Sequence, residues 1–356
     1  MRSQSERQLT KVIQMRQVAQ SDLRPSGPDR DEKELPLSKE LLLRIHELML
    51  KTRLLEERLL QMYRQGHGFF WVGGPGEEGF NVPLGMLMKR GQGPEFDYLH
   101  AHYRQAGTIV ALGEPPIGAL RQMRNTASDP YSGGRNFASH YSIRRWNVVP
   151  VSSPIEVQYS MAIGTAMAQK RLGGDAITIV TGGDAGTAEG DFTTCLLWSS
   201  RPQQELPVLI VVTNNQWGIS TATVDQQSSR IAERGQPFNV RAKTIDGNDP
   251  VIAYQEIESA MAYVRKERKP FLLEARVSRL YGHSSASGAN LVAEEVDCLA
   301  LFEQRLEAWG IVSRNDLDQL RRRFSDELQE AARAVKDEPA PTPESIWDFV
   351  YAGEKK

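Results

Sequence analysis

Two hydrophobic periodicities alternate along this 356-residue chain. Apolar runs rich in β-branched residues predict buried strands at 176–181 and 208–213, and a further apolar run predicts one at 270–277. Apolar residues also recur at helical spacing, which predicts helices at 38–65, 113–126, 155–171, 191–200, 251–266 and 294–335. The segment 241–250 is expected to form a strand and a turn. Strands and helices that alternate in this order predict an α/β fold with a parallel sheet.

Two polar features interrupt this pattern near the N-terminal end. In the helix predicted at 38–65, Glu56, Glu57 and Arg58 are expected to form an exposed charged face. The following run, GHGFFWVGGPGEEG at 66–79, mixes glycines with aromatic residues. Such a run is typical of a loop close to a ligand or to another subunit, and equally of an irregular surface loop.

The stretch from 176 to 218 is the most informative part of the chain. A strand at 176–181 leads through the glycine turn 182–186 into a helix, and the next strand ends at the polar loop 214–218. Strand, helix and strand in this order form a βαβ unit of a parallel sheet. Ligands of such sheets bind beyond the carboxyl ends of the strands. We therefore expect Asp184 and Asn215 to lie at the same edge of the sheet.

The residue types at that edge suit a magnesium diphosphate. A carboxylate from Asp184, an amide oxygen from Asn215, a backbone carbonyl and phosphate oxygens provide the hard oxygen ligands that Mg²⁺ prefers. Gly183, Ala185 and Gly186 are small enough to let backbone amides approach a diphosphate closely. Ordinary turn chemistry explains either segment alone, but the two together favour a cofactor site.

These segments carry a family resemblance. Gly183-Asp184-Ala185 with Asn214-Asn215 resembles the thiamine diphosphate and magnesium motif, although Ala185 stands where the motif has a third glycine. The longer strings GDAGTAEGD and NNQWGIST resemble the alpha subunit of the decarboxylating component of 2-oxoacid dehydrogenase complexes. The branched-chain type is nearest, and the resemblance covers about residues 38–351. It implies a doubly wound, mostly parallel sheet with helices on both faces.

The resemblance also implies roles for individual residues. Asp184, Asn215 and the carbonyl of Trp217 would hold Mg²⁺. His283, in a segment similar to the family's GHS loop, would approach both the diphosphate and the reacting intermediate, and is the expected catalytic residue. The residues expected to bind the cofactor are Tyr103, Arg104, Ser153, Ile155, Gly183, Ala185, Gly186, Asn215 and His283.

The implied reaction is oxidative decarboxylation of a 2-oxoacid, with acyl transfer to the lipoyl group of a transacylase core. The implied assembly contains two alpha and two beta subunits, and the beta subunit supplies the Glu that activates the cofactor. Val72 stands where pyruvate-type subunits carry a His, which favours a branched-chain or other apolar substrate over pyruvate. A related alpha subunit that acts on pyruvate or acetoin is an alternative. A non-catalytic paralogue that serves as an interaction subunit is the other interpretation, motivated by Ala185, Val157, Thr213 and the altered loop 287–290.

Composition and net charge limit which other classes of function the chain can have. A formal net charge of −2 gives no argument for binding to nucleic acid or to membranes, and no apolar run is long enough to span a bilayer. Two cysteines are too few for a disulfide framework and indicate a reducing compartment. We expect the bacterial cytoplasm, with the mitochondrial matrix as the alternative. No G-x-G-x-x-G of a dinucleotide-binding dehydrogenase follows a strand.

The chain is expected to divide into a polar, flexible N-terminal arm, a cofactor-binding α/β domain and a short tail. The arm spans 1–36, the domain 37–351, with a helical C-terminal part from about 291, and the tail 352–356.

Overall fold

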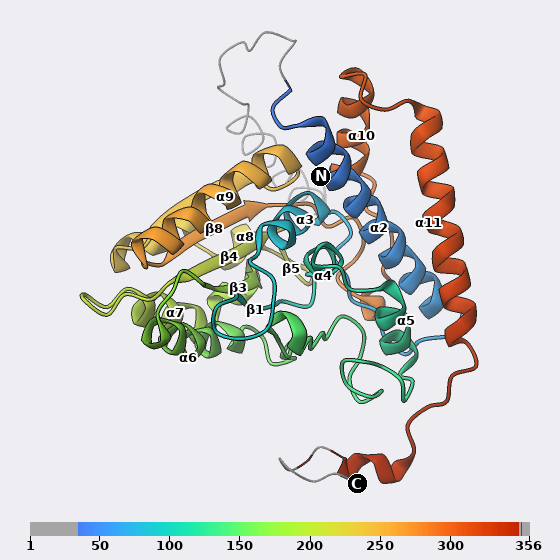
Figure 1. The fold of residues 1–356 in the computed structure, drawn as a ribbon, viewed down its shortest axis with the longest axis horizontal. Coiled ribbons are helices and arrows are strands. Elements are labelled where there is room, and N and C mark those ends of the chain that lie inside the picture. Colours follow the sequence, from blue (N-terminus) through green and yellow to red (C-terminus); the bar gives the residue numbers. More distant parts are fainter. Residues whose placement is uncertain (1–34, 349, 351–356) are drawn as a thin grey trace, which may run out of the picture. The chain divides into compact units, whose positions relative to one another are not determined.

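The predicted strands lie side by side in one six-stranded sheet, in which every pair of neighbouring strands is parallel (Figure 1). The computed structural model describes residues 35–348 and residue 350, so most of the predicted arm and the whole tail lie outside the described residues. The strand order is β2-β1-β3-β4-β8-β7. The strands are β1 (Tyr98–His100), β2 (Val148–Val149), β3 (Thr178–Gly183), β4 (Val208–Asn214), β7 (Arg241–Asp246) and β8 (Phe271–Arg276). A separate antiparallel ribbon joins β5 (Trp217–Gly218) and β6 (Thr221–Ala222).

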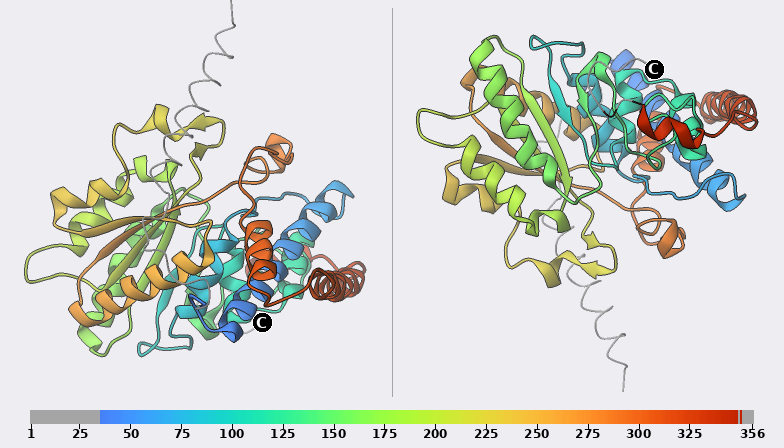
Figure 2. Two further views of the ribbon diagram at one scale, coloured as in Figure 1. Left: turned by 90° about the horizontal axis from the view of Figure 1, so that it is seen from above. Right: turned by 90° about the horizontal axis from the view of Figure 1, so that it is seen from below.

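Helices cover both faces of the sheet, because successive side chains of each strand point to opposite sides. On β3 and β4, Ile179, Leu209 and Val211 join one apolar cluster, whereas Val180 and Ile210 join another. The first cluster lies beneath α3 (Glu78–Leu87), α4 (Ala106–Leu112) and α9 (Pro250–Glu267). The second lies beneath α6 (Val157–Leu172) and α7 (Gly190–Ser199), on the side that Figure 2 shows from below. The doubly wound fold is therefore confirmed.

Within the described residues, the other helices are α2 (Lys39–Arg64), α5 (Pro116–Arg124), α8 (Thr223–Gln226), α10 (Cys298–Ala308) and α11 (Arg314–Val335). Helix α11 packs against α2 and α5 (Figure 1). Five short 3₁₀ segments are η1 (Arg144–Trp146), η2 (Ala185–Ala188), η3 (Ala232–Phe238), η4 (Ser285–Ser287) and η5 (Pro343–Trp347). Within the described residues, no helix is both long enough and apolar enough to cross a membrane.

The segment 294–335 is largely helical, as predicted, but its first helix begins at Cys298 rather than at Glu294. The chain forms two helices, because Gly310 adopts a left-handed conformation with φ of 65° after α10. Ser313 and Asp316 then form a reciprocal capping box that starts α11. The predicted helix start at Ile155 is also wrong by two residues. Glu156 has a φ of 65°, and α6 begins after it.

The predicted exposed face of α2 is wrong at Glu56, which is completely buried, and Glu57 and Arg58 are only half exposed. The loop after α2 folds back over the helix, and the Glu56 carboxylate accepts hydrogen bonds from the Trp71 indole N–H and the Gly74 backbone N–H. Burial raises the pKa of Glu56 to about 7. A local charge pattern could not reveal this, because the covering segment comes from elsewhere in the chain.

A buried ion pair fixes α9 to the amino ends of the central strands. Asp97 is fully buried and accepts two hydrogen bonds from Arg265, at 2.7 and 2.6 Å. It also accepts the backbone N–H groups of Lys89 and Ile177. We expect D97A to lower the free energy of unfolding by about 3–5 kcal/mol, because Arg265 loses its buried partner. Urea unfolding followed by circular dichroism measures this loss.

The matched control is D175A. Asp175 forms an exposed ion pair with Lys89, so its removal should change the free energy of unfolding by less than about 1 kcal/mol. Equal losses in the two variants would contradict the assigned role of Asp97.

Candidate active site

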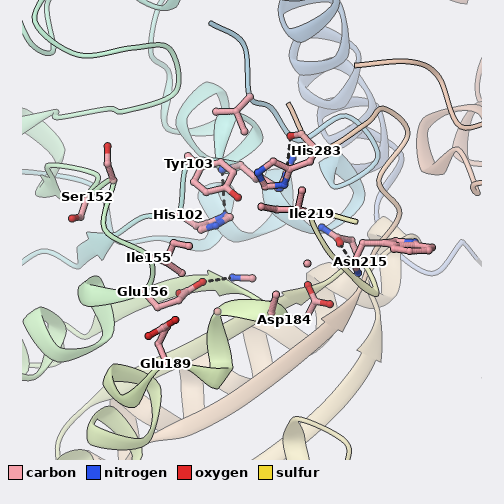
Figure 3. A pocket seen from close by; sticks show the side chains of 18 of the residues that line it. His102, Tyr103, Ser152, Ile155, Glu156, Asp184, Glu189, Asn215, Ile219 and His283 are labelled. Carbon is pink, nitrogen blue, oxygen red and sulfur yellow. Dashed lines mark hydrogen bonds between the residues drawn. The ribbon is translucent and has the colours of Figure 1, made fainter. Parts of the chain in front are cut away.

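A cavity of about 400 Å³ lies beyond the carboxyl ends of β3 and β4 (Figure 3). Its walls come from segments that are far apart in the sequence: the turn after β3, the loop after β4, the segment after β1, the start of α6 and the loop after β8. Every residue that the sequence predicts for the site lines this cavity. These residues are Tyr103, Arg104, Ser153, Ile155, Gly183, Asp184, Ala185, Gly186, Asn215, Trp217 and His283.

Asp184 and Asn215 come together because β3 and β4 are paired in register. Gly183 lies opposite Thr213, so both strands end at nearly the same level. The Asp184 side chain is buried, accepts a hydrogen bond from the Thr223 hydroxyl and forms no ion pair with any of residues 35–348. Burial raises its pKa. The Asn215 side-chain oxygen accepts the backbone N–H of Trp217 at 3.1 Å.

This arrangement fits a divalent cation that is shared with a phosphate ligand. A buried carboxylate without an ion-pair partner needs a positive charge or a proton. The described residues contain no cluster of three His, Cys, Asp or Glu side chains that could hold a metal ion alone. Asp184 and the loop that carries Asn215 provide hard oxygen atoms on one side of the cavity only. The remaining ligands must come from the bound molecule or from water.

Arg104 ties three segments together at the other side of the cavity. Its guanidinium is buried and donates to the backbone carbonyl of Gly73. A second guanidinium nitrogen donates to the carbonyl of His283 at 3.2 Å and lies 3.1 Å from Nδ1 of the same residue. The Tyr103 ring meets the His283 ring edge to face, with centroids 6.3 Å apart. Burial, together with Arg104 and Arg279, lowers the pKa of His283 to about 4, so this imidazole is neutral at pH 7.

The start of α6 contributes an apolar projection and a hydroxyl group. Ile155 lines the cavity, although 63 % of its surface is exposed, which is unusual for a large aliphatic residue. The Ser153 hydroxyl lies 3.0 Å from Nε2 of His140, which also lines the cavity. Ile155 therefore presents an apolar side chain to the cavity.

Glu156 is a cavity residue that the sequence interpretation missed. It is buried, and its carboxyl group accepts the Gly183 backbone N–H and the Gln158 side-chain N–H, each at 3.0 Å. Burial, together with the charges of Asp184, Glu189 and Asp191, raises its pKa to about 8. A Glu at a helix start is so common that no sequence signal distinguishes this one.

The contact with Glu156 has two consequences for the glycine turn. The backbone N–H of Gly183 is engaged by Glu156 and is not available to a ligand. A methyl group on Gly186 would overlap the Glu156 carboxyl group. The turn requires glycine at 186 because this side chain occupies the space.

The sequence profile of the dehydrogenase E1 component family matches residues 46–344. The chain belongs to this family. Among its relatives, the alpha 2 subunit of mitochondrial 2-oxoisovalerate dehydrogenase from Arabidopsis thaliana is 29% identical over 325 residues, which cover 88% of this chain and 67% of that protein. The alpha subunit of 2-oxoisovalerate dehydrogenase from Bacillus subtilis (strain 168) is 29% identical over 321 residues, or 86% and 94% of the two chains. The human mitochondrial alpha subunit is 26% identical over 326 residues, or 88% and 71%.

Membership of the dehydrogenase E1 component family confirms the resemblance drawn from the glycine turn and the Asn-Asn loop. The chain is a 2-oxoacid dehydrogenase subunit of the alpha type, and its mostly parallel sheet agrees with that assignment.

The buried carboxyl group of Glu156 should leave a pH signature in the stability of this E1 component. Its pKa is about 8 in the folded chain and close to the ordinary 4.5 in the unfolded chain. Between about pH 5 and pH 8, the unfolded chain releases this proton and the folded chain keeps it, so stability falls as pH rises. We expect E156Q, which cannot titrate, to lose less stability than the wild type across this window.

Urea unfolding at about pH 5 and pH 8 measures the difference between the two proteins. Glu56 titrates in the same direction in both proteins, so the comparison isolates Glu156. Equal losses in the wild type and E156Q would show that Glu156 is already ionised in the folded chain.

Proposed function

We propose that this chain is the alpha subunit of a thiamine diphosphate-dependent dehydrogenase that acts on a branched-chain 2-oxoacid. It would catalyse oxidative decarboxylation and transfer the acyl group to the lipoyl group of a transacylase. The observation that carries the proposal is the convergence of the expected cofactor residues, from five separate segments, on one cavity.

Within this cavity, Asp184, the Asn215 amide oxygen and the Trp217 carbonyl would hold Mg²⁺. Tyr103 and Arg104 would bind the diphosphate, together with His283 and the backbone at 185–186, and a planar guanidinium suits two phosphate oxygens at once. When bound, thiamine diphosphate supplies a nucleophilic carbon that takes up the electrons left by loss of carbon dioxide.

His283 has the protonation state that a hydrogen-bonding role at the reacting centre requires. Arg104 can only donate, so the Nδ1 that faces it is an acceptor and Nε2 carries the proton. The imidazole is neutral because its pKa is about 4. It can therefore donate a hydrogen bond from Nε2 without bringing a further positive charge to the site.

The proposed assembly contains two of these chains and two beta subunits. The beta subunit would contribute the Glu that activates the cofactor, so this chain is expected to be inactive alone. The proposed location is the bacterial cytoplasm, the setting in which the transacylase core would also be available.

Apolar residues of the cavity favour a branched-chain substrate. Phe70, Val72 and Phe137 line the wall near His140. With the beta subunit and a lipoylated acceptor present, we expect kcat/KM for 3-methyl-2-oxobutanoate to exceed that for pyruvate and acetoin by about 10-fold or more. Side-by-side assays of acyl transfer to the lipoylated acceptor test this, because acetoin has no carboxyl group to lose. A preference for pyruvate or acetoin would contradict the branched-chain assignment and favour a pyruvate or acetoin dehydrogenase subunit.

Asp184 should be essential for metal-dependent cofactor binding. We expect D184N to weaken the binding of thiamine diphosphate in the presence of Mg²⁺ by about 100-fold, because it removes the buried negative charge that faces the cation. Calorimetric titration of the complex with the beta subunit measures this change. D191N is the matched control, since Asp191 bonds to the Ser160 hydroxyl and does not line the cavity, and its affinity should equal that of the wild type.

The same titration tests the enzyme assignment itself. If the wild-type complex binds no thiamine diphosphate at millimolar concentration, the alternative of a non-catalytic interaction subunit is favoured instead.

A further inference from the structure

His102 lines the cavity beside the glycine turn but has no role in the site described above. It follows β1, where its own backbone N–H donates to the Thr181 hydroxyl and anchors it to β3. The side chain is only 8% exposed, and its ring lies against the Tyr103 ring with centroids 3.8 Å apart. Figure 3 shows it between Tyr103 and the Ile155–Glu156 side of the cavity.

The hydrogen bonds of His102 fix its tautomer. Its Nδ1 accepts the backbone N–H of Arg104 at 3.4 Å. A backbone N–H cannot accept a hydrogen bond, so Nδ1 is unprotonated and Nε2 carries the proton. Burial, together with the nearby Arg104, His283 and His140, keeps the pKa of this imidazole well below its usual value. The ring is therefore a neutral, single donor at pH 7.

The Nε2–H of His102 has no acceptor among residues 35–348, and its position indicates what it meets. A methyl group placed on Gly183 would lie 3.8 Å from both Cε1 and Nε2 of His102, so this ring edge faces the turn that carries Asp184. Because this nitrogen is open to the cavity and bonds to no protein group among these residues, it can donate to a ligand there. A ligand acceptor for this donor would lie beside the glycine turn.

We propose that the Nε2–H of His102 donates a hydrogen bond to a phosphate oxygen of the bound diphosphate. This inference rests on the proposed function, because it requires thiamine diphosphate in the cavity. The diphosphate would then be bound by a neutral donor from His102 as well as by the Arg104 guanidinium and the backbone amides that follow Asp184. His102 is then a ligand-binding residue whose orientation depends on the Arg104 backbone.

Calorimetric titration of thiamine diphosphate with Mg²⁺ into the alpha–beta complex tests this inference. We expect H102F, which keeps a ring against Tyr103 but removes the donor, to raise the Kd by about 10- to 100-fold. H102Q, which retains an N–H donor, should recover most of the affinity.

H100F is the matched control. His100 is equally buried and lies two residues earlier, but it bonds to the Thr165 hydroxyl and does not line the cavity, so H100F should leave the Kd within about twofold. Unchanged affinity in H102F, or equal losses in H102F and H100F, would overturn the inference. Titration of the wild-type complex separates the proposed function from the role of His102. If the wild-type complex does not bind thiamine diphosphate, the proposed function fails. If it binds, the variants test only the role of His102.

A second measurement depends neither on activity nor on the affinity of a variant. Nitrogen-15 NMR of the histidine-labelled full chain reports which ring nitrogen carries the proton, and the His102 signals are those absent from H102Q. We expect the Nε2–H tautomer at pH 7 and a shift of the Nε2 signal on addition of thiamine diphosphate with Mg²⁺. An Nδ1–H tautomer, or an Nε2 signal unchanged by bound cofactor, would overturn the inference.

Discussion

The in-register, parallel pairing of β3 with β4 is the constraint on which the site depends. Six consecutive residue pairs, from Thr178 opposite Val208 to Gly183 opposite Thr213, fix the two strands relative to each other. Both strands therefore end at one edge, and the next residues of each chain segment turn into the same space. Because β1 is also parallel to β3, the segment that follows β1 arrives at that edge as well. The pairing of the strands therefore brings these segments together at one edge of the sheet, although they are far apart in the sequence.

The loop after α2, which contributes Phe70 and Val72 to the cavity wall, is held by buried polar contacts. Glu56 of α2 accepts donors from Trp71 and Gly74, and Arg53 of the same helix forms an ion pair with Glu78 at 2.7 Å. Arg104 joins this loop to the loop after β8 through Gly73 and His283. The position of these cavity-lining residues thus depends on a helix that does not line the cavity itself.

Burial sets the charge of the site. It raises the pKa of Glu77 to about 7 and that of Glu156 to about 8, and it lowers the pKa values of His102 and His283. The two imidazoles are therefore neutral near pH 7, and the carboxyl group of Glu156 is largely protonated. Burial also raises the pKa of Asp184, because no ion-pair partner among residues 35–348 offsets it.

The sequence by itself determined the fold class, the central βαβ unit and the residues that meet at its edge. These are consequences of short patterns: buried strands, a glycine turn ending in Asp184 and a polar loop carrying Asn215. The sequence also contains Gly310, at which the chain breaks between α10 and α11. The apolar pattern continues across this residue and therefore does not reveal the break. Only the tertiary structure decided that Glu56 is buried, that Glu156 occupies the space beside Gly186 and that His102 presents Nε2–H to the cavity. Periodicity shows the spacing at which apolar residues recur along the chain. The surroundings of a polar side chain depend instead on which distant segment packs against it.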